Sequence, residues 1–370
     1  MEVVKLKKVA NIYDGIHETP NYEDSGVRFV SVEDIKNLYQ SNKYISHLDY
    51  NKLYTIKPEF NDILMTRIGD IGTTSICDKE EPLAYYVSLA LIKPISINPN
   101  YLYFALQSQL FKKESYKRTI HVAFPKKINL SEIGECLIPL LEKDKQTKIA
   151  TFLNLYYKKI ELQKKKVDLL KLQKHQIIND IFKIQDKTNY IKLSKLLNQI
   201  SIKNKNNLDV PVLSVSNKFG FIPQNEQFEE EVASDDKSNY KLVKLNQFAY
   251  NPARINVGSI AKLMEPYSCG QISPMYICFE CDSKINNDFL GYYLLSSTFK
   301  KEMQKRLEGS VRMCLTFESM CNIKISLPGL SEQQLVVNKL KKIDLKIKTE
   351  ETKLLLLEKY KQGLLQKMFI

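Results

Sequence analysis

The sequence predicts an α+β fold in which two related domains alternate with two long helices, and these spacer helices pair as an antiparallel coiled coil with pseudo-two-fold symmetry. Three observations lead to this prediction. The chain contains an internal repeat, each copy ends in a long stretch with coiled-coil spacing, and short strand-like runs precede each stretch. The predicted parts are 1–141 for the first domain, 142–187 for the first spacer helix, 188–330 for the second domain and 331–370 for the second spacer helix.

The repeat is clearest in a helical segment of each domain. FKKESYKR (111–118) recurs as FKKEMQKR (299–306), with six of eight residues identical. A helix start precedes each copy, because Asn98 is followed by proline at the first helical position and Asn286 opens the corresponding segment. The openings VVKLKKVANI and YIKLSKLLNQI also correspond. We therefore expect two copies of one domain.

The two long helices repeat each other in their apolar positions and in their exceptions. Steps of four and three from Ile149 and from Val336 give eight apolar positions out of ten in each helix, which is the seam of a coiled coil. The first polar interruption is Gln163 in one helix and Glu350 in the other, and the second is Lys174 and Lys361. The predicted seam consists of Ile149, Leu153, Tyr156, Ile160, Val167, Leu170, Ile177, Ile181, Val336, Leu340, Ile343, Ile347, Leu354, Leu357, Leu364 and Met368.

The strand-like runs end just before the long helices. Runs such as VRFVSV, DILMTRI and SLALIKPI, and VPVLSV, QFAYNPARI and PMYICFE, predict strands in the two domains. Pro139 and Pro328 are expected to end the strand regions, because proline cannot continue a ladder. A helix of about 40 residues is roughly 60 Å long, more than one small domain needs. The spacer helices should therefore pair with each other, with pairing between two chains as the alternative.

The composition indicates a globular protein with an anionic partner. The chain has 370 residues, 44% of them apolar, and a net charge of +13, for which nucleic acid is the commonest partner. It begins without a signal-peptide pattern and has no long uncharged apolar run, so we expect a cytoplasmic protein with no membrane segment. Seven cysteines then indicate reduced thiols, and Cys278 and Cys281 should point to opposite faces of a strand.

No catalytic motif stands out in the sequence. The stretch GDIGTTSI has glycines and hydroxyls but lacks the lysine of a phosphate-binding loop. The four histidines are scattered, without metal-ligand spacing, and no carboxylate cluster indicates a nuclease. The sequence therefore predicts a binding protein that holds no metal or cofactor of its own.

Two sets of residues are candidates for DNA contacts. Cations recur at equivalent places in the two repeats, where they suit phosphate contacts: Lys117, Arg118, Lys126, Lys127, Lys305, Arg306 and Arg312. Shorter polar groups and arginines near Gly72 and Gly258 are candidates for base contacts, although ordinary turn chemistry would also place such residues there: Arg67, Asp70, Thr73, Thr74, Asn251, Arg254, Asn256 and Ser259.

This organisation resembles the specificity subunit of Type I restriction-modification systems. The resemblance covers essentially the whole chain and is most specific in the Leu-Pro-x-Leu-x-Glu-Gln-Gln pattern at 327–334. The helix endings KHQIINDIFK and KYKQGLLQKMF match as well. The first copy, IPLLEKDKQ, departs from the pattern because Lys143 and Asp144 stand in the Glu-Gln region.

The resemblance implies a non-catalytic reader of double-stranded DNA, made of two target recognition domains and a coiled-coil spacer. It implies two adenine methyltransferase subunits that bring S-adenosylmethionine, and two motor and nuclease subunits that use ATP and Mg²⁺. One alternative is a stand-alone DNA-binding regulator, and another is an orphan methyltransferase specificity subunit without a motor. Apolar residues off the seam favour a further protein partner over the regulator: Leu155, Leu169, Leu345, Leu355 and Leu356.

Overall fold

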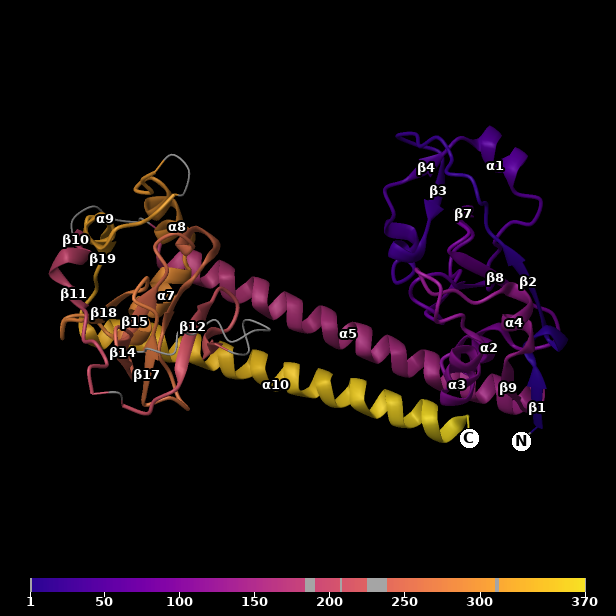
Figure 1. Ribbon diagram of the computed structural model, residues 1–370. Helices are drawn as coiled ribbons and strands as arrows, with labels where there is room; N and C mark the ends of the chain where they lie inside the picture. The colour runs from indigo at the N-terminus through magenta and orange to yellow at the C-terminus, as the bar shows by residue number, and fades with distance from the viewer. Residues whose placement is uncertain (1, 184–189, 207, 225–237, 310–312, 370) are drawn as a thin grey trace. The chain divides into compact units, whose positions relative to one another are not determined.

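The computed structural model describes residues 2–183, 190–206, 208–224, 238–309 and 313–369 (Figure 1). The chain divides into two compact units. The first unit joins residues 1–165 to 352–370, and the second is the continuous stretch 166–351. Each unit therefore holds one mixed domain together with one half of each long helix. Among the described residues, no helix is long and apolar enough to cross a membrane.

The first unit contains nine strands and the beginning of the long helix α5 among its described residues (Figure 1). Its elements in chain order are β1 (Glu2–Lys5), η1 (Leu6–Lys8), β2 (Ala10–Asp14), β3 (Val27–Val30), η2 (Val32–Asp34), η3 (Leu38–Gln40), β4 (Tyr44–Ile45), α1 (His47–Leu53), β5 (Ile63–Thr66), β6 (Thr74–Ile76), β7 (Leu83–Tyr85), β8 (Leu89–Pro94), α2 (Pro99–Ala105), α3 (Gln109–Arg118), α4 (Leu130–Glu135), β9 (Leu137–Leu140) and α5 (Lys143–Ile181).

The second unit follows a related order, with ten strands among its described residues where the first has nine, and ends in the long helix α10. Its described elements are β10 (Tyr190–Lys192), η4 (Leu193–Lys195), β11 (Leu197–Ile200), β12 (Val212–Ser216), β13 (Gly220–Pro223), β14 (Lys241–Lys244), β15 (Phe248–Tyr250), η5 (Ile255–Val257), β16 (Ile260–Lys262), β17 (Cys269–Ile272), β18 (Ile277–Cys281), α7 (Asn287–Leu295), α8 (Ser297–Gln304), α9 (Phe317–Cys321), β19 (Lys324–Ser326) and α10 (Leu330–Met368).

The sheets confirm that the two domains are copies of one fold. A four-stranded sheet has the order β2-β8-β5-β6 in the first unit and β11-β18-β15-β16 in the second. A second sheet is built around a parallel pair, β3 with β7 and β12 with β17. A short antiparallel pair, β1 with β9 and β10 with β19, leads into each long helix. The predicted α+β repeat is therefore correct in topology as well as in sequence.

One strand prediction is wrong in detail. Pro139 does not end the strand region, because it lies inside β9 and is paired with Val3 of β1. Proline is tolerated there because β9 belongs to a sheet of only two strands and so is an edge strand. Pro328 does follow the end of β19, as predicted.

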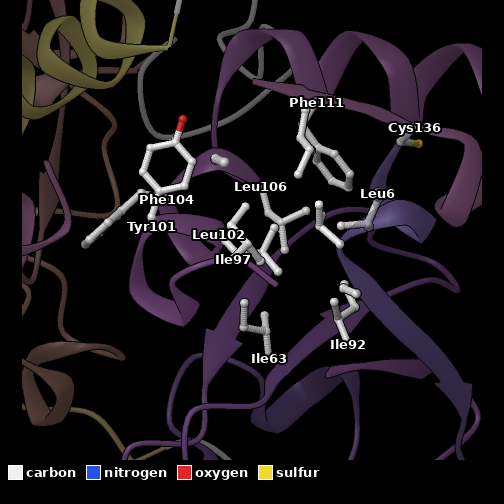
Figure 2. Packing of buried hydrophobic residues seen from close by; sticks show 14 of the residues in the cluster. Leu6, Ile63, Ile92, Ile97, Tyr101, Leu102, Phe104, Leu106, Phe111 and Cys136 are labelled. Carbon is white, nitrogen blue, oxygen red and sulfur yellow. The ribbon is translucent and has the colours of Figure 1, made fainter. Parts of the chain in front are cut away.

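The core of the first unit lies between the four-stranded sheet and the helices that cover it. Figure 2 shows Leu6, Ile63, Ile92, Leu102 and Phe111 gathered in this cluster, and each of them is fully buried. The last turns of α10 complete the same cluster, because Leu365 and Phe369 are buried in it. The core of this domain therefore includes residues from the far end of the chain.

The core of the second unit is built in the same way. The rings of Phe248 and Phe279 stack with centroids 5.1 Å apart between neighbouring strands. Here the last turns of α5 supply Ile178 and Phe182, and the ring of Phe182 lies 5.0 Å from that of Phe289. Each mixed domain is thus closed by the end of a long helix that began in the other half of the sequence.

The two long helices run antiparallel, as predicted. In the first unit the hydroxyl of Tyr156 donates to the carbonyl of Leu357 over 3.0 Å. In the second unit Lys171 forms an ion pair with Glu351 over 2.7 Å, and Lys174 pairs with Asp344. Residue numbers therefore rise along α5 as they fall along α10.

All sixteen predicted seam residues are buried or partly buried, whereas most positions between them are exposed. The lysine at the second polar position of the seam has different neighbours in the two units. Lys174 meets the carboxylate of Asp344, whereas Lys361 lies 4.0 Å from the ring centroid of Tyr157, which occupies the repeat position of Asp344. Burial lowers the pKa of Lys361. The two halves of the helix pair are therefore related but not identical.

A buried glutamine fixes the start of each long helix. In α5, Gln146 accepts a hydrogen bond from the backbone N–H of Asn98 over 2.9 Å and donates to the carbonyl of Leu141 over 2.7 Å. In α10, Gln333 accepts from the N–H of Asn286 over 2.8 Å and donates to the carbonyl of Pro328 over 2.8 Å. Although IPLLEKDKQ departs from the pattern of the second copy, it retains one glutamine. Gln146 forms the same two kinds of hydrogen bond in the first copy that Gln333 forms in the second.

Gln333→Ala should destabilise the protein by about 1–3 kcal/mol, because it leaves the partly buried N–H of Asn286 and two carbonyls without their partner. The measurement is denaturant unfolding followed by circular dichroism. Gln173→Ala removes an exposed glutamine from α5 and should change stability by no more than about 0.5 kcal/mol. Equal effects of the two substitutions would contradict the role of the buried glutamine.

Candidate nucleic-acid interface

In the first unit, two stretches that are far apart in sequence form one surface feature. The turn 67–74 follows β5, and the hairpin 119–128 follows α3. The N–H of Gly69 donates to the carbonyl of Lys126 over 2.8 Å, and the N–H of Ile128 donates to the carbonyl of Arg67 over 3.0 Å. These bonds bring the predicted base-contact residues of the turn next to Lys126 and Lys127. We call the turn and the hairpin together the first tip.

The second unit repeats this arrangement. The N–H of Leu315 donates to the carbonyl of Pro252 over 3.1 Å, which is the counterpart of the bond between Ile128 and Arg67. Glu308 and Cys314 exchange two backbone hydrogen bonds of 2.9 and 2.8 Å and close the corresponding hairpin. The turn 251–259 with residues 305–309 and 313–315 is called the second tip. Predicted Arg312 lies outside the described residues.

The turn of the first tip requires a glycine. Gly72 has a φ of +90°, which side chains other than glycine rarely adopt. Its backbone lies over α3, since a Cβ built there would be 3.7 Å from the hydroxyl of Ser115. Next to it, the N–H of Thr73 donates to the hydroxyl of Thr66 over 2.9 Å. The hydroxyl oxygen of Thr74 is buried without a hydrogen-bond partner among the described residues.

Three of the predicted base-contact residues are engaged within the fold. Arg67 is only 9% exposed, and its guanidinium donates to Asp14 over 3.2 Å. Ser259 is buried and donates to the carbonyl of Val215 over 2.9 Å. The side-chain oxygen of Asn251 accepts from the N–H of Ala253 over 3.0 Å. These side chains hold the turns in shape.

Four of the other predicted residues of the turns have side chains that reach the surface, whereas the hydroxyl of Thr74 is buried. Asp70, Arg254 and Asn256 are exposed, and Thr73 is half-buried. A carboxylate suits the amino group of cytosine, an arginine suits guanine and an asparagine suits adenine. The two tips therefore present different polar groups from equivalent turns.

The cations repeated at the ends of α3 and α8 are paired with carboxylates. Glu114 lies 3.3 Å from Lys117 and 3.4 Å from Arg118, and Arg118 also binds Glu132 over 3.1 Å. In the second unit, Glu302 pairs in the same way with Lys305 and Arg306, each over 2.7 Å, and these bonds lower the pKa of Glu302. The recurrence of these cations thus has a structural cause, because each copy keeps its glutamate as well.

Lys126 and Lys127 differ from these paired cations. Both are exposed on the hairpin of the first tip, and neither forms an ion pair within the part of the chain that the structure describes. Their charges are therefore available to an anionic partner. Among the predicted cations of the first unit, these two fit phosphate contacts best.

The sequence analysis did not single out the apolar residues of the first tip. Val122 and Phe124 are 97% and 104% exposed. Beside them, His121 donates to the carbonyl of Tyr116 over 2.9 Å, and the two rings lie 4.4 Å apart. The signal in the sequence was the short apolar run inside HVAFPKK, flanked by cations.

The described residues contain no metal-ligand cluster. No group of three or more His, Cys, Asp or Glu side chains in the described ranges is placed to hold a metal ion. Cys278 packs in one apolar cluster of the second unit and Cys281 against another, so they face opposite sides of β18, as predicted. Burial raises the pKa of Cys278 to about 11 and that of Cys281 to about 12, which keeps both thiols protonated.

A family model matches this chain over almost its whole length. The model describes the Type I restriction modification DNA specificity domain and matches residues 1–172 and 176–359. It therefore matches twice, once in each half of the chain.

Two curated proteins of Methanocaldococcus jannaschii are similar in sequence. The "Type I restriction enzyme MjaVIII specificity subunit" is 37% identical over 100 residues, which is 26% of this chain and 23% of that protein. The "Putative type I restriction enzyme MjaX specificity subunit" is 23% identical over 392 residues, which is 95% of this chain and 88% of that protein.

Solved structures show the same fold. The S subunit of a Type I restriction-modification system from M. genitalium aligns with a TM-score of 0.59 at 14% identity, over 100% of this chain and 96% of that one. A chain from a structural description of complex assembly and conformational transition in the type I R-M system aligns with a TM-score of 0.64, also at 14% identity, over 100% of this chain and 97% of that one.

Replacing Lys126 and Lys127 together by alanine should weaken binding to DNA of any sequence. If each ammonium contacts a phosphate, the slope of log Kobs against log salt should become shallower by about 2. The measurement is fluorescence anisotropy over a salt series. Lys148→Ala with Lys159→Ala on α5 removes the same charge from exposed positions and should leave the slope unchanged. A changed sequence preference with an unchanged slope would contradict the phosphate role.

Proposed function

Since this chain belongs to the family of Type I restriction-modification DNA specificity domains, we propose that it reads a bipartite, asymmetric target in double-stranded DNA with one half-site for each domain. Members of this family recognise DNA sequence and are not themselves enzymes. The observation that supports the bipartite target is the repeated tip. The same backbone bond positions a turn and a hairpin in both units, but their exposed side chains differ.

The domains have the proposed bounds 1–141 and 188–330, and the spacer helices are 142–187 and 331–370. A half-site separation is set when two DNA-binding domains are held by a rigid element. The antiparallel helices α5 and α10 suit that role, because ion pairs and a largely apolar seam hold them together in each unit. An unread gap would then lie between the two half-sites.

The outer faces of the spacer helices suit the docking of methyltransferase subunits. On α5, Leu155, Leu162 and Leu169 are each more than half exposed and recur every seven residues. On α10, Leu345, Leu355 and Leu356 are equally exposed. Apolar stripes of this kind belong to interfaces with other proteins. Two adenine methyltransferase subunits would bring S-adenosylmethionine, and two motor and nuclease subunits would bring ATP and Mg²⁺, in the cytoplasm.

The exposed leucines favour a protein partner, and a stand-alone DNA-binding regulator would not need one on these helix faces. An orphan methyltransferase specificity subunit is the second candidate, since it keeps the stripes and differs only in lacking the motor. The two candidates differ in DNA cleavage. Unmodified target DNA should be cut when the motor subunit and ATP are added to a complete system, and should remain intact in the orphan case.

The direct test is to co-express the chain with its methyltransferase in a host without DNA methylation, and to map modified adenines by single-molecule sequencing. A split asymmetric motif with a fixed gap is the expected result, because the two tips present different groups. A soluble complex that modifies no defined motif would overturn the proposed function.

Exchange of residues 1–141 for another recognition domain should change the bases of one half-site alone, because each tip is built entirely within its own unit. The measurement is again the map of modified adenines. The gap length and the other half-site should stay as they were, since both helices and the second domain are kept. Altered bases on both sides of the gap would contradict separate recognition by the two domains.

A further inference from the structure

The hairpin of the first tip is a short two-stranded ribbon with a fixed base. Ile120 donates through its N–H to the carbonyl of Lys127 over 2.8 Å, which pairs the two strands. Below that pair, Lys126 and Ile128 are bonded to the turn after β5, at Gly69 and Arg67. The stem is further tied to α3, because the hydroxyl of Thr119 donates to the carbonyl of Ser115 over 2.7 Å. The end of the ribbon is thus held at a defined place on the domain.

Both the apolar and the charged side chains of this ribbon are directed to solvent. Phe124 and Val122 are almost completely exposed, whereas Phe104 and Phe111 of the same unit are fully buried in its core. Single exposed apolar residues are common. Here, however, two of them share a ribbon with the unpaired cations Lys126 and Lys127. An apolar tip flanked by cations is complementary to a surface with phosphates at its edges and apolar groups between them.

A two-stranded hairpin suits the major groove of B-form DNA. That groove is about 12 Å wide and admits a two-stranded ribbon, whereas the minor groove is only about 6 Å wide. Phe124 and Val122 have no side-chain hydrogen-bonding group, so they can distinguish bases only through apolar contacts. The one apolar group on a base edge in the major groove is the C5-methyl of thymine.

We propose that hairpin 119–128 enters the major groove of the half-site read by the first domain, where Phe124 reads a thymine through its C5-methyl group. Val122 packs beside it, and Lys126 and Lys127 hold the flanking phosphates. This inference rests on the proposed function and deepens it, because it assigns a specificity-determining residue to one half-site. Arg67 and Gly69 act as positioning residues, because their backbone groups hold the base of the ribbon.

The experiment uses the complex with the methyltransferase and the duplex target defined by the methylation map. Each thymine of the first half-site, on either strand, is replaced in turn by deoxyuridine, which lacks only the methyl group. Affinity is measured by anisotropy for the natural protein, for Phe124→Ala and for Phe60→Ala. Phe60 is a matched control, because it is an exposed phenylalanine of the same unit outside the hairpin.

For the natural protein and for Phe60→Ala, one deoxyuridine position should weaken binding by about threefold to tenfold. Phe124→Ala should bind the thymine target more weakly by a similar factor and should respond no further to deoxyuridine. Because Phe124 is fully exposed, its replacement should leave the melting temperature unchanged.

Three results would overturn the inference. The first is binding of every deoxyuridine duplex by the natural protein as tightly as the thymine duplex. The second is full affinity and a full deoxyuridine response in Phe124→Ala. Loss of the methyltransferase from the Phe124→Ala complex in gel filtration would show that the hairpin contacts a protein instead. A failure of the proposed function is recognised separately, because no methylation motif would then exist from which to design the duplex.

Discussion

Each recognition domain depends on packing by the end of a helix that begins in the other half of the sequence. In the first unit, Phe369 at the end of α10 lies 5.3 Å from the ring of Tyr101. In the second, Phe182 at the end of α5 lies 5.0 Å from Phe289. Removing a buried phenylalanine side chain costs about 3–5 kcal/mol, a large part of the stability of a domain. The end of a long helix is therefore part of each domain's core.

This arrangement explains why the repeat has been kept in some places and not in others. The buried glutamines Gln146 and Gln333 each form hydrogen bonds with backbone groups at the junction of domain and helix. Replacing either glutamine would leave those backbone groups unpaired. The paired residues Glu114 and Glu302 order the last turn of α3 and α8. These positions hold the scaffold of the two tips. The exposed side chains of the tips carry no such constraint, which leaves them able to differ between half-sites.

The tips also show how a binding site is made from residues with different tasks. Arg67, with its buried guanidinium on Asp14, shapes the turn from within, whereas Asp70 three residues later reaches the surface. Lys117 and Arg118 neutralise carboxylates of their own domain, while Lys126 and Lys127 remain exposed on the hairpin. Polar residues that lie close together in sequence therefore differ in exposure, and in the proposed function only the exposed ones would contact DNA.

The sequence by itself determined the duplication, the α+β class and the antiparallel helix pair with its seam from Ile149 to Met368. These features follow from local periodicity and from direct comparison of two copies, and both are visible in one dimension. Only the tertiary structure brought the turn at Gly72 next to the hairpin at Lys126, because backbone bonds between segments about sixty residues apart leave no pattern in the sequence. The tertiary structure also decided which of the candidate side chains are exposed to solvent. Whether an arginine is buried on an aspartate or a phenylalanine extends into solvent depends on what the fold packs around it, as Arg67 and Phe124 show.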